Sequence, residues 1–155
     1  MKEILLVEDS EPDAQLVFRA LKRHRLANPV RHIRDGLQAM NYLRQIEKVA
    51  AIGPGLPGVL LLDLKLPGMS GYEILESLRQ RPPRAQILRV VLSQIGDVHM
   101  IKRAYGLGAD SYLVKPLRED DLLDLIAAFP GYWAFSPRVA SAPQPPSIRQ
   151  ASTSL

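Results

Sequence analysis

Residues 58–71 read Gly-Val-Leu-Leu-Leu-Asp-Leu-Lys-Leu-Pro-Gly-Met-Ser-Gly, and this stretch decides the fold. The run Gly58 to Leu62 is too short for a helix and shows no polar alternation, so it predicts a strand that is buried on both faces. Such strands occur in parallel sheets that carry helices on either side. The carboxylate of Asp63 then stands directly at the end of this strand.

Short apolar runs of the same kind alternate with segments of helical period along the chain. The other strands are predicted at Glu3 to Val7, Val30 to Arg34, Ile87 to Leu92 and Ser111 to Val114. Helices are predicted from Pro12 to about Arg25, Leu37 to about Ile46, Ser70 to before Pro82, Asp97 to Gly106, and Glu119 to Phe129. The alternation predicts an α/β domain with a parallel sheet of five strands and with five helices, and the weak run at 30–34 is expected at an edge. At the start of the first helix, Ser10 and Asp13 have the spacing of a capping box.

The composition is that of a single compact domain. The 155 residues are 46% hydrophobic, which is enough for one core and too little for two substantial ones. The sequence holds no cysteine, which excludes disulfides, thiolate metal sites and cysteine nucleophiles. There is no apolar run long enough to span a membrane and no signal-peptide pattern after Met1, so we expect a cytoplasmic protein without a membrane partner.

The net charge of +4 is slight and dispersed. Arg138 and Arg149 are the only charged residues after position 129, so the preceding part has 18 basic and 16 acidic residues, a net charge of +2. The longest basic cluster, Lys22 to Arg25, lies where a helix is predicted to end, and cations there complement the helix dipole. We therefore expect no nucleic-acid partner.

Two stretches lie outside the βα pattern. Residues 47–57 form a connection longer than is usual between a helix and a strand, and they predict a surface loop. Residues 130–155 follow the domain at 1–129 as an extension rich in Pro and Ser, which predicts disorder beyond about Pro137. The aromatic residues of 132–135 are expected to pack on the last helix or on a second subunit, because exposed aromatic surface is costly.

Residues with reactive side chains follow four of the predicted strands: Glu8 and Asp9, Asp63, Ser93, and Lys115 with Pro116. The carboxyl ends of parallel strands meet at one edge of the sheet, so these side chains are expected to converge. Crowded carboxylates must either protonate or bind a cation, and an all-oxygen ligand set favours Mg²⁺. Asp63 follows the central strand and is the best-placed nucleophile toward phosphorus, once the metal and the lysine have neutralised the incoming charge.

Each of these residues also has an ordinary structural explanation. A Glu-Asp pair after a strand is often a helix N-cap, Ser93 can satisfy the end of its strand, and a Lys-Pro pair often marks the end of an element. The combination is much rarer than its parts, because four separate strands must end in the required chemistry and in the required order.

Four motifs carry a resemblance to a known family. They are Ile4-Leu5-Leu6-Val7-Glu8-Asp9, Leu61 to Gly71, Val90-Val91-Leu92-Ser93, and Tyr112-Leu113-Val114-Lys115-Pro116. In kind, order and spacing they resemble the receiver domain of two-component response regulators over residues 1 to about 129. The resemblance implies a flavodoxin-like (βα)5 fold, a doubly wound parallel five-stranded sheet of order 2-1-3-4-5. The lack of an output domain, the long connection at 47–57 and Tyr132-Trp133 also resemble short regulators that partner phytochrome-type histidine kinases.

The family pattern implies a role for each matching position. Asp63 would be the phosphoacceptor, Asp9 and Asp63 direct ligands of Mg²⁺, Glu8 a ligand largely through water, and Lys65 a ligand through its backbone carbonyl. Lys115 would pair with the phosphoryl group and be followed by a cis peptide bond to Pro116. Ser93 and Tyr112 would form a conformational switch. Gly71 fits the chain reversal after Asp63, where we expect a positive φ.

The resemblance also implies partners. A sensor histidine kinase is expected to dock near the first helix and the fifth strand, through apolar residues such as Leu16 or Phe18. A homodimer is expected through the fourth helix, fifth strand and fifth helix together with residues 132–135. Gln94 departs from the small residue usual in the family, and together with Lys65 it predicts an unusual phosphoryl lifetime.

Other functions stay open beside this one. A DNA-binding regulator would need a reader module, which the extension at 130–155 does not resemble. Residues 59–63 resemble the strand that presents a Walker-B aspartate, but no G-x-x-x-x-G-K-[ST] sequence accompanies them, and an Asp-x-Asp phosphatase would need an acid where Lys65 stands. The histidines at 24, 32 and 99 are too scattered for a zinc enzyme. A receiver-like scaffold that never accepts phosphate is the alternative that Gln94 favours.

Of these functions, we expect that of a signalling receiver, which promotes only its own phosphorylation and dephosphorylation and has no other enzymatic activity.

Overall fold

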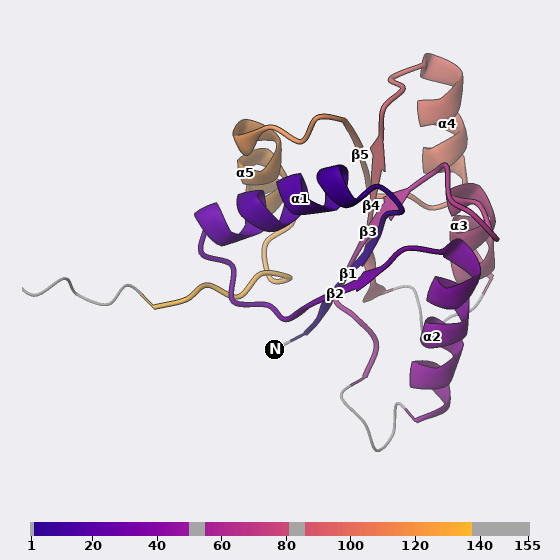
Figure 1. Ribbon diagram of the computed structural model, residues 1–155, viewed down its shortest axis with the longest axis horizontal. Helices are drawn as coiled ribbons and strands as arrows, with labels where there is room; N and C mark the ends of the chain where they lie inside the picture. Colours follow the sequence, from indigo (N-terminus) through magenta and orange to yellow (C-terminus); the bar gives the residue numbers. More distant parts are fainter. Residues whose placement is uncertain (1, 50–54, 81–85, 138–155) are drawn as a thin grey trace, which may run out of the picture.

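A parallel sheet with helices on both faces forms the molecule (Figure 1). The computed structural model describes residues 2–49, 55–80 and 86–137. The strands are β1 (Ile4–Val7), β2 (Val30–Ile33), β3 (Val59–Asp63), β4 (Leu88–Ser93) and β5 (Ser111–Val114). The helices are α1 (Glu11–Arg23), α2 (Gly36–Lys48), α3 (Gly71–Arg79), α4 (Val98–Gly106) and α5 (Glu119–Ala128).

The strand order is β2-β1-β3-β4-β5, and every pair of neighbours is parallel. This order confirms the predicted fold, and each predicted strand is present with its ends displaced by one residue at most. Strand β3 lies at the centre and every one of its residues is buried, because its apolar side chains serve both faces. The weak strand β2 lies at an edge, and its first two residues are exposed.

Two separate cores cover the two faces of the sheet. Leu60 and Leu62 of β3 pack with apolar residues of α2, α3 and α4, while Val59 and Leu61 pack with those of α1 and α5. The alternation follows from strand geometry, in which successive side chains point to opposite faces. Figure 1 shows the same division, with α1 and α5 on one side of the sheet and α2 and α3 on the other. Burial of both faces fixes the register of the strands, and therefore the positions of the residues at their ends.

The N-terminus of α1 differs in one respect from the prediction. Ser10 is the N-cap and its hydroxyl accepts from the backbone N–H of Asp13 at 3.4 Å. In place of the reciprocal capping bond, the Asp13 carboxylate accepts from Nζ of Lys115 at 3.0 Å. A complete capping box is present at α3, between Ser70 and Glu73. The spacing rule is therefore correct for the cap residue and wrong for its partner.

Residues 130–137 pack back on their own domain. Leu26 and Phe135 form an antiparallel bridge, and the backbone N–H of Ala27 donates to the carbonyl of Ala134 at 2.7 Å. Tyr132 and Trp133 are half-buried against the α1 and α5 core, and Trp133 Nε1 donates to the carbonyl of Phe129 at 2.9 Å. This confirms that the aromatic segment packs beside the last helix. The expected disorder beyond Pro137, and residues 50–54 of the expected loop, lie outside the described residues.

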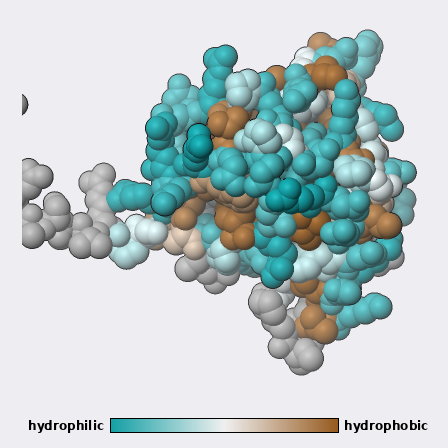
Figure 2. Space-filling model, in the orientation of Figure 1, coloured by the Kyte–Doolittle hydropathy of each residue, from teal (hydrophilic) through white to brown (hydrophobic). Residues whose placement is uncertain are grey.

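The surface in Figure 2 is mostly hydrophilic, with small separate apolar areas.

Helix α2 extends to Lys48, two residues past its predicted end. Among the residues that the structure describes, no helix combines the length and the apolar character needed to cross a membrane.

Gly71 is required by a close approach of backbone and not by the positive φ that the sequence suggested. A Cβ at this position would lie 2.4 Å from the carbonyl oxygen of Asp63 and 2.8 Å from Cα of Leu64. The residue of this loop with a positive φ is Gly68, at 80°. The start of α3 is thus pressed against the end of β3, which fixes the backbone at Asp63.

We predict that Gly71→Ala lowers the free energy of unfolding by about 2–3 kcal/mol, because the backbone of Asp63 and Leu64 cannot yield as a flexible side chain would. Urea unfolding followed by circular dichroism measures the change. Gly106→Ala is the control, since a Cβ there meets nothing within 4 Å. A Gly71→Ala protein as stable as the Gly106→Ala protein would contradict this explanation of the glycine.

Candidate functional site

Four strand ends place their reactive side chains at one edge of the sheet. Oxygen atoms of Glu8, Asp9 and Asp63 lie within 4.8 Å of one another. Nζ of Lys115, which follows β5, donates to Asp63 at 3.2 Å and also contacts Glu8. The residues that sequence analysis assigned to one site are therefore brought together, because the parallel register aligns the ends of β1, β3 and β5 through β4.

Lys115 is the positive centre of this cluster. Its ammonium contacts the carboxylates of Glu8, Asp13 and Asp63, and only 10% of its side chain is exposed. Burial disfavours the charged form, but the hydrogen bonds to Glu8 and Asp13 outweigh it, so the pKa of Lys115 is raised. The lysine is therefore charged throughout the physiological range. The peptide bond between Lys115 and Pro116 is cis, as the resemblance implied.

Glu8 is the most deeply buried of the acidic side chains. It is 1% exposed, and burial, followed by the neighbouring Asp63 carboxylate, raises the pKa of Glu8 to about 9. Its Oε2 atom is buried and has no hydrogen-bond partner among the described residues. One lysine does not compensate the carboxylates gathered here, so the cluster favours an added cation.

The donor set fits a hard divalent cation. Every group in the cluster offers oxygen, which is the ligand that Mg²⁺ prefers, and one of the buried oxygens has no other partner. Lys65 lines the same pocket, and its backbone N–H donates to Asp63 Oδ1 at 3.2 Å. The loop after β3 is thereby folded back over the Asp63 carboxylate.

A pocket of about 230 Å³ opens above these groups. Its lining comprises Asp9, Ser10, Asp13, Asp63, Lys65, Ser93, Gln94, Ile95 and Lys115. Gln94 is exposed at this lining, whereas Ser93 is 4% exposed. Sequence analysis did not assign Ser10 or Asp13 to the site. The available signal was a polar pair in the first turn of a helix that starts directly after Glu8 and Asp9, and it was interpreted as capping alone.

Ser93 and Tyr112 both bind the backbone of Ile95. The Ser93 hydroxyl accepts from the N–H of Ile95 at 3.2 Å, and the hydroxyl of Tyr112 donates to the carbonyl of Ile95 at 2.6 Å. The Tyr112 ring is half-buried against the core on the α4 side. A single residue after β4, Ile95, therefore links the two residues that the resemblance assigned to a switch.

The two residues expected to dock a kinase differ in exposure. Leu16 on α1 is 40% exposed and lines a shallow surface pocket with Arg19, Arg23 and Leu117. Phe18 is half-buried against the α1 and α5 core, and its ring meets His32 edge-on with centroids 5.5 Å apart. Of the two side chains, only that of Leu16 is exposed enough to contact a partner protein.

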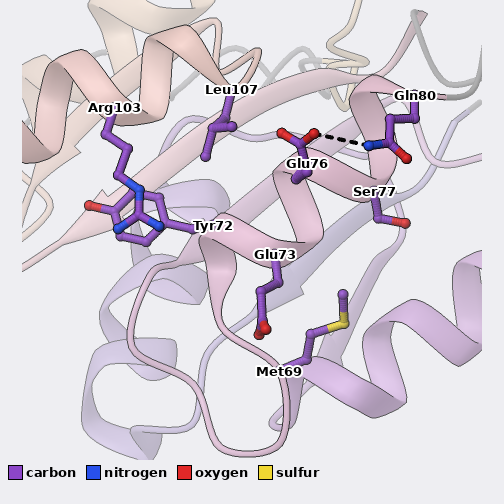
Figure 3. Close-up of a pocket in the computed structure, with 8 residues that line it drawn as sticks. All are labelled: Met69, Tyr72, Glu73, Glu76, Ser77, Gln80, Arg103 and Leu107. Atoms are coloured by element: carbon purple, nitrogen blue, oxygen red, sulfur yellow. Dashed lines mark hydrogen bonds between the residues drawn. The ribbon is translucent and has the colours of Figure 1, made fainter.

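A second pocket lies between α3 and α4, and its lining includes none of Glu8, Asp9 and Asp63 (Figure 3). The guanidinium of Arg103 on α4 lies 3.9 Å from the ring centroid of Tyr72 on α3, a cation–π contact. Arg79 of α3 also donates to the carbonyl of Gly106 at the end of α4, at 3.0 Å. These contacts tie α4 to α3 and offer no cluster of reactive groups.

Comparison with known proteins agrees with this geometry. The family model described as the response regulator receiver domain matches residues 4–127. The chain belongs to this family. As a receiver domain it carries its acidic residues at the strand ends where the motifs had predicted them.

Three proteins illustrate the similarity. FilR2 of Methanothrix harundinacea, described as a probable methanogenesis regulatory protein, is 37% identical over 130 residues, covering 84% of this chain and 82% of FilR2. The response regulator Rcp1 of Synechocystis is 34% identical over 132 residues, covering 85% and 88%. The Mn²⁺-bound crystal structure of Rcp1 covers 83% of this chain and 91% of its own, with a TM-score of 0.67. The bacteriophytochrome response regulator RtBRR is 37% identical, with a TM-score of 0.75 over 96% of this chain and 87% of RtBRR.

We predict that Mg²⁺ raises the melting temperature of this receiver domain by about 5–10 °C at a concentration 100 times the Kd, because a ligand of the folded state stabilises it by mass action. Asp9→Asn is expected to abolish most of this increase, since Asp9 belongs to the cluster without contacting Lys115. Thermal unfolding with and without Mg²⁺ measures the effect.

Asp124→Asn provides the control, because Asp124 is an exposed carboxylate in α5 outside the acidic cluster. The same Mg²⁺-dependent increase in wild type and in Asp9→Asn would exclude the cluster as the cation site.

Proposed function

We propose that this protein is a single-domain response regulator that accepts a phosphoryl group from a sensor histidine kinase onto Asp63. The observation that carries the proposal is the position of the Asp63 carboxylate, in a pocket, 3.2 Å from the Lys115 ammonium and beside Glu8 and Asp9. Its only chemistry would be its own phosphorylation and dephosphorylation, and phosphotransfer from a kinase would take place in the cytoplasm.

The proposed transfer is a displacement at phosphorus. One oxygen of the Asp63 carboxylate forms a bond to phosphorus while the bond from phosphorus to the kinase histidine breaks, and the released imidazole takes up a proton. Mg²⁺ bound by Asp9 and Asp63 directly, by Glu8 through water and by the Lys65 carbonyl would supply charge neutralisation. Lys115 then donates to a phosphoryl oxygen, and the Ser93 hydroxyl lies in the same pocket as a second donor.

The contacts of Ile95 support a switch between Ser93 and Tyr112. If the Ser93 hydroxyl turns toward a phosphoryl oxygen, the N–H of Ile95 loses its partner and the loop after β4 is released. The Tyr112 hydroxyl donates to the carbonyl of the same residue, so movement of Ile95 would break this bond as well and release the ring to take a second position. Phosphorylation would shift the population between these two arrangements by the difference in their contacts.

The residues at the pocket rim bear on the lifetime of the phosphoryl group. Gln94 and Lys65 are exposed, and both line the pocket that an attacking water would have to enter. We propose that the lifetime departs from that of receivers with a small residue after the switch serine. Decay of the labelled protein measures it, and Gln94→Ala with an unchanged decay rate would exclude Gln94 as a cause.

Labelling with acetyl phosphate tests the central proposal, since it needs no kinase. In the presence of Mg²⁺, wild type is expected to form a base-labile acyl phosphate that gel mobility and intact mass detect. Asp63→Asn is expected to form none, because an amide cannot act as the nucleophile. Asp124→Asn is the control for removal of a carboxylate and is expected to label normally. Labelling of Asp63→Asn at the wild-type rate would refute Asp63 as the acceptor, and absence of label in wild type would favour a scaffold that is not phosphorylated.

The partner that we propose is a phytochrome-type histidine kinase. The support is the similarity to RtBRR, which is a bacteriophytochrome response regulator, over 96% of this chain. The exposed Leu16 lies beside Leu117, which follows the reactive Lys115, so a kinase bound here has its phosphohistidine close to the pocket. The adjoining Arg19 offers positive charge at the rim of the contact, whereas Arg23 pairs with Glu119 at 3.3 Å.

We predict that Leu16→Asp lowers the rate of phosphotransfer from such a kinase by about tenfold or more, because a buried anchor of an interface costs at least 1.4 kcal/mol when it is replaced by a charge. Labelling by acetyl phosphate is expected to stay unchanged. Leu37→Asp is the matched control, since Leu37 is 50% exposed and belongs to α2 on the other face of the sheet. Phe18→Asp is a poor substitute, because Phe18 packs against the core. Equal transfer rates for the Leu16 and Leu37 variants would exclude this surface.

The homodimer expected from the sequence also stays a proposal. Val98, Tyr105, Val114 and Leu123 on α4, β5 and α5 are large apolar side chains that are at least 44% exposed, which supports an interface on this face. Tyr132 and Trp133 contribute less than expected, because they pack on their own chain. Light scattering at high concentration tests the interface, and a monomeric mass would exclude it.

A DNA-binding regulator remains the alternative from another class. The described domain carries no feature that favours it over the phosphoryl site, and salt-dependent binding to duplex DNA is the measurement that would support it.

A further inference from the structure

The ammonium of Lys115 has three N–H donors, and three carboxylates receive them. They belong to Glu8, Asp13 and Asp63. Glu8 and Asp63 are members of the acidic cluster, whereas Asp13 lies outside it. All three donors are therefore used, and a phosphoryl oxygen can gain a hydrogen bond from Lys115 only if one carboxylate loses its own.

Asp13 is the carboxylate that gives up this bond at the lowest cost. Its side chain is 24% exposed, against 2% for Glu8 and 11% for Asp63. Water can replace the lysine at an exposed carboxylate, whereas a buried one would be left without a partner. Asp63 is itself the group that would carry the phosphoryl group, so it stays close to Lys115 in either state.

The local structure holds Asp13 in place for this contact. Ser10 caps α1 and accepts from the backbone N–H of Asp13, which positions the first helical turn over the end of β5. Burial opposes the charge on Asp13, but the hydrogen bond from Lys115 outweighs it, and the pKa of Asp13 is lowered. The carboxylate also lines the pocket into which a phosphoryl group would enter.

We propose that Asp13 is a positioning residue that holds the Lys115 ammonium in the unphosphorylated protein and is exchanged for a phosphoryl oxygen on phosphorylation. This inference rests on the proposed function, because it assigns to Asp13 a competing role in the same reaction. Asp13 restrains phosphorylation in two ways: it occupies a donor that the phosphoryl group needs, and its negative charge repels that group.

Asp13→Asn is therefore expected to accept phosphate from acetyl phosphate faster than wild type, by on the order of tenfold, since a neutral acceptor binds an ammonium more weakly than a carboxylate does. Beryllofluoride, a non-covalent analogue of the phosphoryl group, is expected to bind with a Kd lower by a similar factor. Asp13→Ala is likewise expected to raise the labelling rate and to lower the Kd for beryllofluoride. Loss of structure would instead lower the rate and raise the Kd.

Glu11→Gln is the matched control. Glu11 lies in the same first turn of α1 and carries the same charge, but it pairs with Arg34 and not with Lys115. A rate close to wild type for Glu11→Gln separates the contact with Lys115 from a general effect of charge. In a Lys115→Gln background, Asp13→Asn is expected to accelerate labelling less than it does in the wild-type background, because only the charge repulsion is then relieved. A purely structural role of Asp13 would change the rate equally in both backgrounds.

The outcomes separate the inference from the function on which it rests. If wild type accepts phosphate and Asp13→Asn does so no faster, or if Glu11→Gln accelerates labelling as much as Asp13→Asn, the role of Asp13 is refuted while the phosphorylation of Asp63 stands. If wild type and every variant remain unlabelled in the presence of Mg²⁺, the proposed function fails and the inference fails with it.

Discussion

The contact between one ammonium and several carboxylates is the interaction on which the site depends. Glu8, Asp13 and Asp63 reach Lys115 from α1 and from the ends of β1 and β3. Bringing these carboxylates together without a cation would cost several kcal/mol, because like charges in a partly buried pocket repel and lose their hydration. Lys115 removes part of that cost and leaves a negative excess that suits a divalent cation. In the proposed reaction, a phosphoryl group would gain a hydrogen bond from Lys115 only when one of these carboxylates releases its own.

The fold connects this pocket to a distant surface through few contacts. Ile95 bonds both Ser93 in the pocket and Tyr112 on β5, and it leads into α4. At the far end of α4, Arg103 stacks on Tyr72 and Arg79 of α3 holds the carbonyl of Gly106. Helix α4 is thus anchored at its C-terminal half to α3, and its N-terminal side continues from a loop whose residues 94 and 95 line the pocket. In the proposed switch, a change at Ser93 would reach the exposed face of α4 and β5 through these contiguous contacts.

Local patterns predicted most of the fold and failed where a residue met a partner remote in sequence. The strands were predictable because continuous apolar runs between turn residues permit little else, and β3 shows this best. The pair Ser10 and Asp13 was interpreted as a capping box, but Lys115, 102 residues later, takes the Asp13 carboxylate. Gly71 was assigned to a positive φ, while the constraint is contact with the carbonyl of Asp63. Phe18 was expected at the surface, yet it packs against the core.

The sequence by itself determined the elements, the two-sided burial of the sheet and the residues that stand at the strand ends, because periodicity and turn chemistry are local properties. Only the tertiary structure decided which groups share the donors of Lys115, that the backbone of Ile95 joins Ser93 to Tyr112, and that the segment at Tyr132 and Trp133 returns to residues 25–28. These pairings depend on ångström-scale placement of segments far apart in the chain. Hydrogen bonds lose their strength within fractions of an ångström and a few tens of degrees, so no local sequence pattern specifies those that join segments far apart in the chain.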